Sequence, residues 1–111
     1  MSLNQIGPEK VADALKSKKT FALLAETFQA LSDPSRVQIV YALSRGELCV
    51  NDLVSLLAMS QPAVSHHLRT LREMNLVKMR KDGRTSFYSL DDEHIDRLLK
   101  HGIDHVEDLL S

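Results

Sequence analysis

NDLVSLLAMSQPAVSHHLRTLREMNLVKMRKDGRTSFYSL, residues 51–90, is the stretch that decides the fold. Apolar residues recur at helical spacing in two segments, residues 51–57 and 61–74, which a tight connection joins. The period then changes from about 3.6 to 2 in residues 76–80 and 85–90, with the hairpin signal Asp-Gly between them. Two short helices joined by a tight turn and followed by a basic hairpin are typical of a winged helix-turn-helix. The sequence therefore predicts a mainly α fold with a small two-stranded β-wing.

The rest of the chain is expected to complete a single domain over residues 1–111. Within it we assign residues 51–75 to the helix-turn-helix and residues 76–90 to the β-wing. Residues 92–110 have helical periodicity and a broad apolar face, which predicts a final helix. Residues 1–8 carry no periodicity and are predicted to be a flexible N-terminus.

Three helices are predicted upstream of the helix-turn-helix. A short one runs from Glu9 to about Lys18, and a second runs from Thr20 to Leu31. The third begins at the break Ser32-Asp33-Pro34, where Asp33 can cap the helix and Pro34 fits its first position.

Composition limits the class of protein. The chain is 43% apolar and 26% charged, which is ordinary for a globular domain. No apolar run approaches the ~20 residues of a membrane span, and no charged-then-apolar leader is present. The single cysteine excludes an internal disulfide and suits a reducing compartment. We therefore expect a cytoplasmic protein with no membrane partner.

The net charge of −1 conceals a segregated distribution. From Arg69 to Arg84 six basic residues outnumber two acidic ones, whereas seven acids oppose two bases from Thr85 onward. Phosphates respond to the local patch, because charges are screened beyond about 8–10 Å at physiological salt. On charge alone, an ordinary solvated face is the simpler interpretation.

The second helix of the predicted pair has the pattern of a DNA-reading helix. Its apolar residues share one arc, and the opposite face carries Gln61, Ser65, Arg69 and Arg72. A helix in the major groove presents its N-terminal half to base edges, where Gln suits adenine and Arg suits guanine or phosphate. An amphipathic surface helix is the alternative. The tight turn before it and the basic hairpin after it, with Lys81 and Arg84 near flanking phosphates, favour DNA binding.

Three segments together resemble the ArsR/SmtB family of metal-responsive repressors, over roughly residues 20–110. They are TFQALSDPSRVQIVYAL (27–43), ELCVNDLVSLLAMSQPAVSHHLRTLREMNLVKMRKDGRTSFYSL (47–90) and the histidine-bearing tail. The resemblance implies a homodimer, joined through its N- and C-terminal helices, that represses by binding double-stranded operator DNA and releases it with an inducer. Its DNA-contacting positions fall on Gln61, Ser65 and His66, and Asn75 stands where many members have glycine. The full predicted DNA-contact set is Ser60, Gln61, Ser65, His66, Arg69, Lys81 and Arg84. His67 lies on the apolar side and is expected to be a packed structural residue.

The family's thiolate site is not expected to function here. Where that site has a Cys-Val-Cys run, this chain has Cys49-Val50-Asn51, so the second sulfur is missing. A soft, sulfur-rich metal site needs two or three thiolates. Cys49 is therefore expected to be a small packed residue.

The final helix carries a different set of ligands, His94, His105 and Asp108, with Asp92 at its start. His94 and His105 are eleven residues apart, so they share a face but lie roughly 16 Å apart along the axis. One ion cannot bind both through bonds of about 2 Å. If two copies pack antiparallel, the pair Asp92 and His94 of one chain meets His105 and Asp108 of the other, which gives two equivalent sites.

This pattern resembles the family's zinc site on the C-terminal helix, whose last ligand is more often Glu or His than Asp. Two imidazoles and two carboxylates suit Zn²⁺, with Co²⁺ as its mimic. Ni²⁺ would want more ligands, for which His101 is the spare candidate. The alternative is that these histidines only border a dimer interface.

The sequence thus predicts a repressor that zinc, or a similar divalent metal, releases from its operator. One alternative keeps DNA binding but is metal-independent or responds to another signal, such as redox chemistry at Cys49. Another is an interaction module that does not bind DNA. An enzyme with a small-molecule substrate is not expected: His101 is followed by Gly102 rather than the Glu of a zinc hydrolase motif, and no phosphate-binding loop or nucleophile elbow occurs.

Overall fold

The computed structural model describes residues 7–111, which form six helices and three strands. In chain order they are α1 (Pro8–Ala14), α2 (Lys18–Ala30), α3 (Pro34–Ser44), β1 (Leu48–Cys49), α4 (Val50–Leu57), α5 (Gln61–Glu73), β2 (Val77–Asp82), β3 (Thr85–Leu90) and α6 (Glu93–Leu110). Most of the predicted flexible N-terminus, residues 1–6, lies outside the described residues, and Pro8 already begins α1.

Local capping explains most helix boundaries. The side chain of Asp33 accepts a hydrogen bond from the Arg36 amide at 3.0 Å, and Ser60 accepts one from the Ala63 amide at 3.2 Å. Each satisfies an amide that the first turn of a helix leaves without a partner. Asn75 follows α5 with φ 58°, a left-handed conformation that Asn tolerates better than most residues. These predicted caps and this terminator are confirmed.

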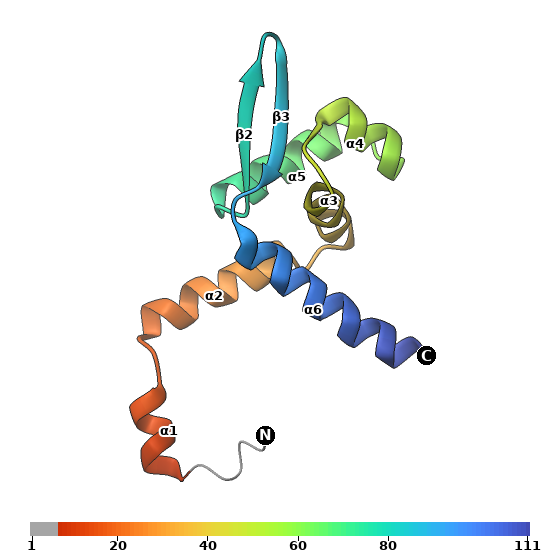
Figure 1. Ribbon diagram of the computed structural model, residues 1–111. Coiled ribbons are helices and arrows are strands. Elements are labelled where there is room, and N and C mark those ends of the chain that lie inside the picture. The colour runs from red at the N-terminus through yellow and green to blue at the C-terminus, as the bar shows by residue number, and fades with distance from the viewer. Residues whose placement is uncertain (1–6) are drawn as a thin grey trace.

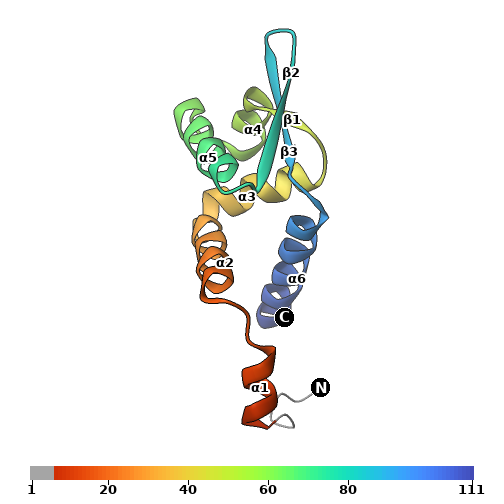
Figure 2. The same ribbon diagram turned by 90° about the vertical axis from the view of Figure 1, so that its left-hand side faces the viewer.

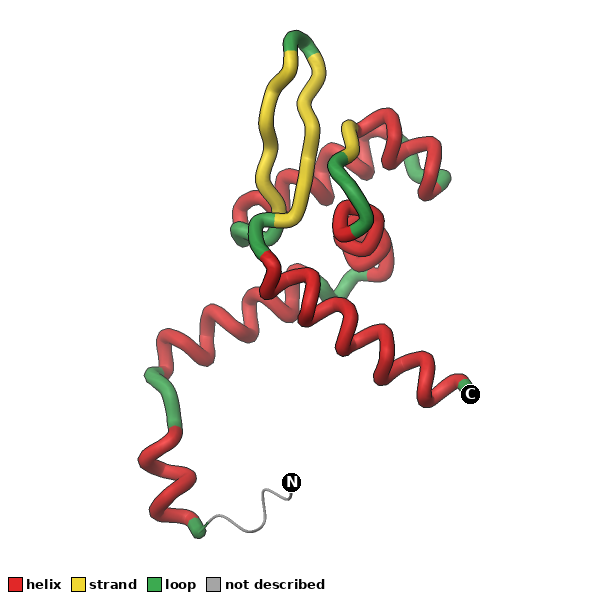
Figure 3. The backbone as a smooth tube through the Cα atoms, viewed as in Figure 1, coloured by secondary structure: helices red, strands yellow, loops and turns green. Residues whose placement is uncertain are grey.

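The sheet differs from the prediction by one strand. It has three antiparallel strands in the order β1-β3-β2, so the predicted two-stranded wing was incomplete. β1 pairs Leu48 with Tyr88 and Cys49 with Phe87, and Figure 3 shows it as a short strand beside the long hairpin. A strand of two residues is too short to show alternation, so nothing in the sequence separated it from the loop before α4.

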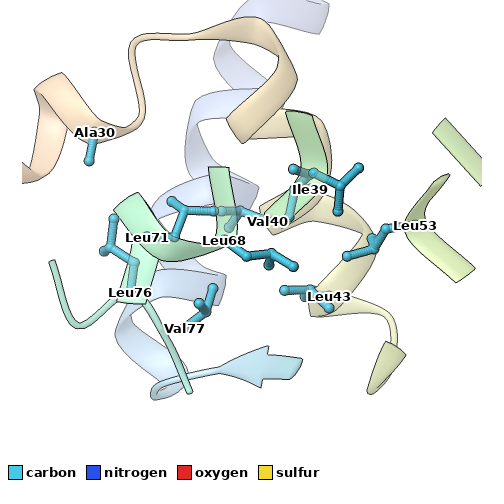
Figure 4. Close-up of a cluster of buried hydrophobic side chains, with 10 residues drawn as sticks. Ala30, Ile39, Val40, Leu43, Leu53, Leu68, Leu71, Leu76 and Val77 are labelled. Carbon is cyan, nitrogen blue, oxygen red and sulfur yellow. The ribbon is translucent and has the colours of Figure 1, made fainter. Parts of the chain in front are cut away.

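The hydrophobic core lies between the helix-turn-helix and α3. Its fully buried side chains come from α3, α4 and α5 and from Leu76 just before β2. They include Ile39 and Val40 of α3, Leu53 of α4, and Leu68 of α5. Figure 4 shows these side chains meeting in one cluster, together with Leu76, just before β2, and Val77, its first residue. Because α5 contributes to this core along one face, its opposite face is held at the surface.

The wing and the terminal helices lie at opposite ends of an elongated molecule that measures 56 × 36 × 20 Å. In Figures 1 and 2 the β2–β3 hairpin projects from one end, and α1, α2 and α6 lie at the other. Within the described residues, no helix combines the length and apolar character needed to cross a membrane.

The two helices α4 and α5 and the β2–β3 hairpin that follows them are present in the predicted order. The mainly α winged helix-turn-helix fold is therefore confirmed.

Candidate functional site

The turn between α4 and α5 fixes the position of the predicted DNA-reading helix. Ala58 ends α4 in the left-handed region with φ 52°, and Ser60 then caps α5. Val64, Leu68 and Leu71 are buried on the inner face of α5. This burial sets the rotation of the helix about its own axis, and therefore which side chains face outward.

The predicted contacts on α5 fall on its outer face with one partial exception. Gln61, His66 and Arg69 are exposed, whereas Ser65 is half-buried. Ser60 is exposed, and its hydroxyl already accepts the capping hydrogen bond, so its first role is to start the helix.

His67 faces inward, as expected. Its Nε2 lies 3.8 Å from Oδ2 of Asp33, and its side chain is only 17% exposed. The same Asp33 oxygen accepts the hydrogen bond from the Arg36 amide that caps α3. The His67–Asp33 contact therefore ties α5 to the turn between α2 and α3.

The wing carries the other predicted contacts at its tip. Asp82 pairs with Thr85, so the hairpin turns through Gly83 and Arg84 alone. Gly83 has φ 64°, which suits the tight turns that match the twist of a hairpin. Arg84 lies in this turn and Lys81 lies two residues before it, and both are exposed. Both cations therefore lie at the end of the molecule away from the terminal helices.

A hollow of about 430 Å³ lies between α5 and the wing, and part of its lining was not predicted. Ser65, Arg69, Arg72 and Glu73 of α5 line it together with Tyr88 of β3. The predicted contact set omits Arg72 and Tyr88. Arg72 follows Arg69 by three residues and so shares its face, a signal visible in the sequence. No sequence signal could place Tyr88 there, because that contact depends on how β3 packs against the helix.

Asp92 and His94 lie together at the start of α6. Oδ1 of Asp92 lies 3.4 Å from Nδ1 of His94. The same oxygen accepts hydrogen bonds from the backbone amides of His94 and Ile95 at 2.8 and 3.3 Å. Desolvation opposes ionisation of Asp92. The two amide hydrogen bonds and the nearby imidazole nevertheless lower its pKa, so it is a carboxylate at neutral pH. Asp92 thus caps α6, in addition to its predicted role as a metal ligand.

The other two predicted ligands, His105 and Asp108, are exposed near the far end of α6. By helix geometry His105 lies roughly 16 Å along the axis from His94, and Asp108 lies farther still. Within residues 7–111 of one chain, no three His, Cys, Asp or Glu side chains gather closely enough to hold a metal ion. The predicted ligands therefore lie in one chain as two separate pairs, which we call the predicted half-sites: the first pair (Asp92, His94) and the second pair (His105, Asp108).

Cys49 lies apart from these half-sites, at the start of α4. It is half-buried, and its amide donates to Oδ2 of Asp52 at 3.0 Å. That hydrogen bond is the main cause of a lowered pKa at Asp52. Cys49 thus ends β1 and is the N-cap residue of α4, which begins at Val50.

An apolar groove runs along α6 beside the half-sites. It measures about 440 Å³ and is lined by Phe28, Leu31, Val37, Leu98, Leu99, Gly102, Ile103, Val106 and Glu107. Val106 is 49% exposed, Leu109 71% and Leu110 81%. A contiguous apolar surface of this kind is typical of an interface rather than of a monomer's exterior.

Comparison with known proteins identifies the family. A model of the arsR family of bacterial regulatory proteins matches residues 33–79, from the cap of α3 into β2. The chain is 48% identical over 85 residues to a transcriptional repressor SmtB homolog of Synechocystis sp., covering 77% of this chain and 64% of that protein's length. It is 44% identical over 89 residues to a cadmium resistance transcriptional regulatory protein CadC homolog of Staphylococcus aureus, covering 79% and 74% respectively.

A solved structure agrees with these relatives. The homodimeric winged helix-turn-helix DNA-binding domain of a possible ArsR-family regulator from Mycobacterium bovis superposes with a TM-score of 0.78 at 25% identity. The superposition covers 88% of this chain and 94% of that one. By its sequence relatives and its fold, this chain belongs to the ArsR/SmtB family of transcriptional regulators.

Proposed function

We propose that the chain is a homodimeric transcriptional repressor whose affinity for operator DNA falls when zinc binds between the two α6 helices. The observation that carries the proposal is the placement of two half-sites on one exposed helix, beside an apolar groove that one chain leaves uncovered.

The DNA-binding part of the proposal is supported by the outer face of α5 and the wing. Gln61 and His66 are exposed on the N-terminal half of α5, which is the half that reads base edges in helix-turn-helix proteins. Arg69 and the wing-tip residues Lys81 and Arg84 add positive charge on either side. Cations of this kind bind DNA phosphates. Phosphate contacts set the register and the affinity of the protein on DNA rather than its sequence preference.

Dimerisation is supported by the groove along α6. A second copy of the chain would cover Phe28, Ile103 and Val106, and a two-fold axis would bring the same surface of each copy together. The Mycobacterium bovis neighbour is a homodimer. An antiparallel pair of α6 helices would set the first pair of each chain against the second pair of its partner.

The donor set fits zinc. Asp92 is ionised at neutral pH, and its Oδ1 already lies 3.4 Å from the imidazole of His94. His105 and Asp108 are exposed and would supply a second imidazole and carboxylate. Borderline-soft Zn²⁺ accepts this mixture of nitrogen and oxygen ligands. When bound, it would supply coordination bonds that join the two helices. The CadC relative is named for cadmium resistance, which is consistent with metal regulation in the family.

A path for the signal runs from α6 to the DNA-reading helix through packed side chains. Ile95 and Leu99 of α6 pack against the core cluster that contains Ile39 of α3 and Leu68 of α5. Because a close-packed core transmits displacement rather than absorbing it, a change in the angle between the α6 helices would reach α5. In the dimer, the same change would alter the spacing of the two α5 helices, and this spacing decides the fit to two half-sites of DNA.

Fluorescence anisotropy with a labelled duplex, chosen by in vitro selection against the wild-type chain, tests the proposal. We expect binding that falls steeply as salt rises, because phosphate contacts release counterions. Addition of zinc should weaken binding of the wild type but not of a variant with alanine at all four ligand positions. Salt-independent binding would contradict DNA recognition, and an unchanged affinity of the wild type with zinc would contradict the metal response.

A further inference from the structure

Arg80 of the wing is engaged by the protein itself. Its Nε and Nη2 donate to the two carboxylate oxygens of Glu47 at 2.8 and 2.7 Å, a bidentate pair. Its guanidinium lies 4.9 Å from the ring centroid of Phe87, and its Nη1 lies 4.0 Å from Oδ2 of Asp82. Paired donors in this geometry fix an arginine's orientation as well as its position.

The contact crosses the whole sheet. Phe87 lies on the central strand β3 and pairs with Arg80 of β2 on one side and with Cys49 of β1 on the other. Arg80 therefore extends from β2 across Phe87 to Glu47, the residue immediately before β1. Because β1 leads directly into α4, this contact joins the wing to the first helix of the helix-turn-helix.

The pair is charged at neutral pH. The hydrogen bond from Arg80 is the main cause of a lowered pKa at Glu47, and the same bond raises the pKa of Arg80. With three nitrogens directed at carboxylates, Arg80 differs from its neighbours Lys81 and Arg84, which have no ion pair within the described part of the chain. Its charge contributes to the local basic excess, but Glu47 already engages two of its five N–H donors.

We propose that Glu47 and Arg80 form a brace that holds the wing at the angle DNA binding requires, with Arg80 a positioning residue rather than a phosphate contact. This inference rests on the proposed DNA-binding function. It also assigns Glu47, an acid near a surface that binds a polyanion, a favourable role in that binding.

The sign of one substitution separates the brace from simple electrostatics. Glu47→Gln removes a negative charge near the DNA-binding surface, so charge alone would tighten DNA binding. If the brace positions the wing, the same change weakens binding, because the wing must then be ordered when the complex forms. Glu73→Gln is the matched control: Glu73 lines the hollow between α5 and the wing and has no ion pair among the described residues.

The experiment measures anisotropy of the selected duplex with the full chain and four variants. We expect Glu47→Gln to weaken binding about threefold to fivefold, as suits an exposed but bidentate pair. Arg80→Lys, which keeps the charge but loses the bidentate geometry, should weaken it by a similar factor. The double variant should be no weaker than the weaker single one, since both remove the same contact. Glu73→Gln should bind at least as tightly as the wild type.

Hydrogen exchange in the protein without DNA gives a second readout. Loss of the brace should speed exchange of amides in β1 and β2 while those of α5 stay protected. Glu47→Gln binding as tightly as the wild type or tighter, or Arg80→Lys binding like the wild type, would overturn the proposal. If the wild type selects no duplex, the proposed function itself fails and the positioning role falls with it. Unchanged exchange in β1 and β2 would instead refute the brace alone.

Discussion

Mixing two inactive variants should restore zinc binding, because each proposed site takes one pair of ligands from each chain. A His94→Ala dimer has no complete site, since both sites lack that imidazole. A His105→Ala dimer has none for the corresponding reason. In a mixed dimer, however, both substitutions fall in the same site. The other site is then built from the intact His94 of one chain and the intact His105 of the other.

The magnitude follows from the symmetry of the dimer. Random reassociation of equal amounts of the two variants gives about half mixed dimers, each with one complete site where the wild type has two. The mixture should therefore bind about one quarter as much zinc at high affinity as the wild type. The distance of roughly 16 Å between His94 and His105 in one helix is what forbids a site within one chain.

Zinc would be measured by competition with a chromophoric chelator, and subunit exchange would be followed by mass spectrometry with one variant isotopically labelled. His101→Ala, on the same helix but outside the four ligands, is the matched control and should bind zinc like the wild type. A fully exchanged mixture that binds no more zinc than the separate variants would refute the shared site. Retention of wild-type binding by either single variant would refute that ligand.

Three further results are expected. Val106→Glu places a charge in the apolar groove along α6 and should therefore convert the dimer to a monomer. Lys100→Glu, on the solvated face of the same helix, is the control and should leave the dimer intact. Size-exclusion chromatography with light scattering measures both. Gln61→Ala should weaken binding to the selected duplex by about 1–3 kcal/mol and, in a repeated selection, relax the sequence preference at one base pair. An equal loss of affinity for all DNA sequences would instead indicate that Gln61 contacts a phosphate. In urea unfolding, Ser60→Ala should lower the free energy of unfolding by about 1 kcal/mol, because α5 loses its cap. Ala58→Gly should raise the free energy of unfolding by up to about 1 kcal/mol, because glycine adopts the left-handed conformation without strain. If both substitutions changed the free energy of unfolding in the same direction, this account of the turn would be contradicted.

The elements that the sequence predicts well are those whose signals are local. The caps at Asp33 and Ser60 and the terminator at Asn75 each act within one turn of helix, so short sequence patterns locate them. The predicted first helix, residues 9–18, extends beyond the observed α1, which ends at Ala14. The side chain of Ser17 accepts a hydrogen bond from the Thr20 amide and caps α2, which begins at Lys18.

Features that depend on the fold were harder to predict. β1 exists only because Leu48 and Cys49 meet β3 across the sheet. Glu47 and Arg80 are 33 residues apart, and the sequence shows them only as two charges. The four proposed metal ligands rest on their spacing along the helix and on the resemblance to the family's zinc site, whereas the capping role of Asp92 appears only with the start of α6 in place.

The central claim is that zinc and DNA oppose each other through one dimer, and thermodynamic reciprocity gives its most direct test. Isothermal titration would compare the zinc affinity of the protein alone with that of the protein saturated with the selected duplex. A coupling of about 1–3 kcal/mol predicts that DNA weakens zinc binding about 5-fold to 150-fold, with the four-ligand alanine variant showing no tight zinc binding in either state. Equal zinc affinity with and without DNA, or tight binding retained by that variant, would contradict the account.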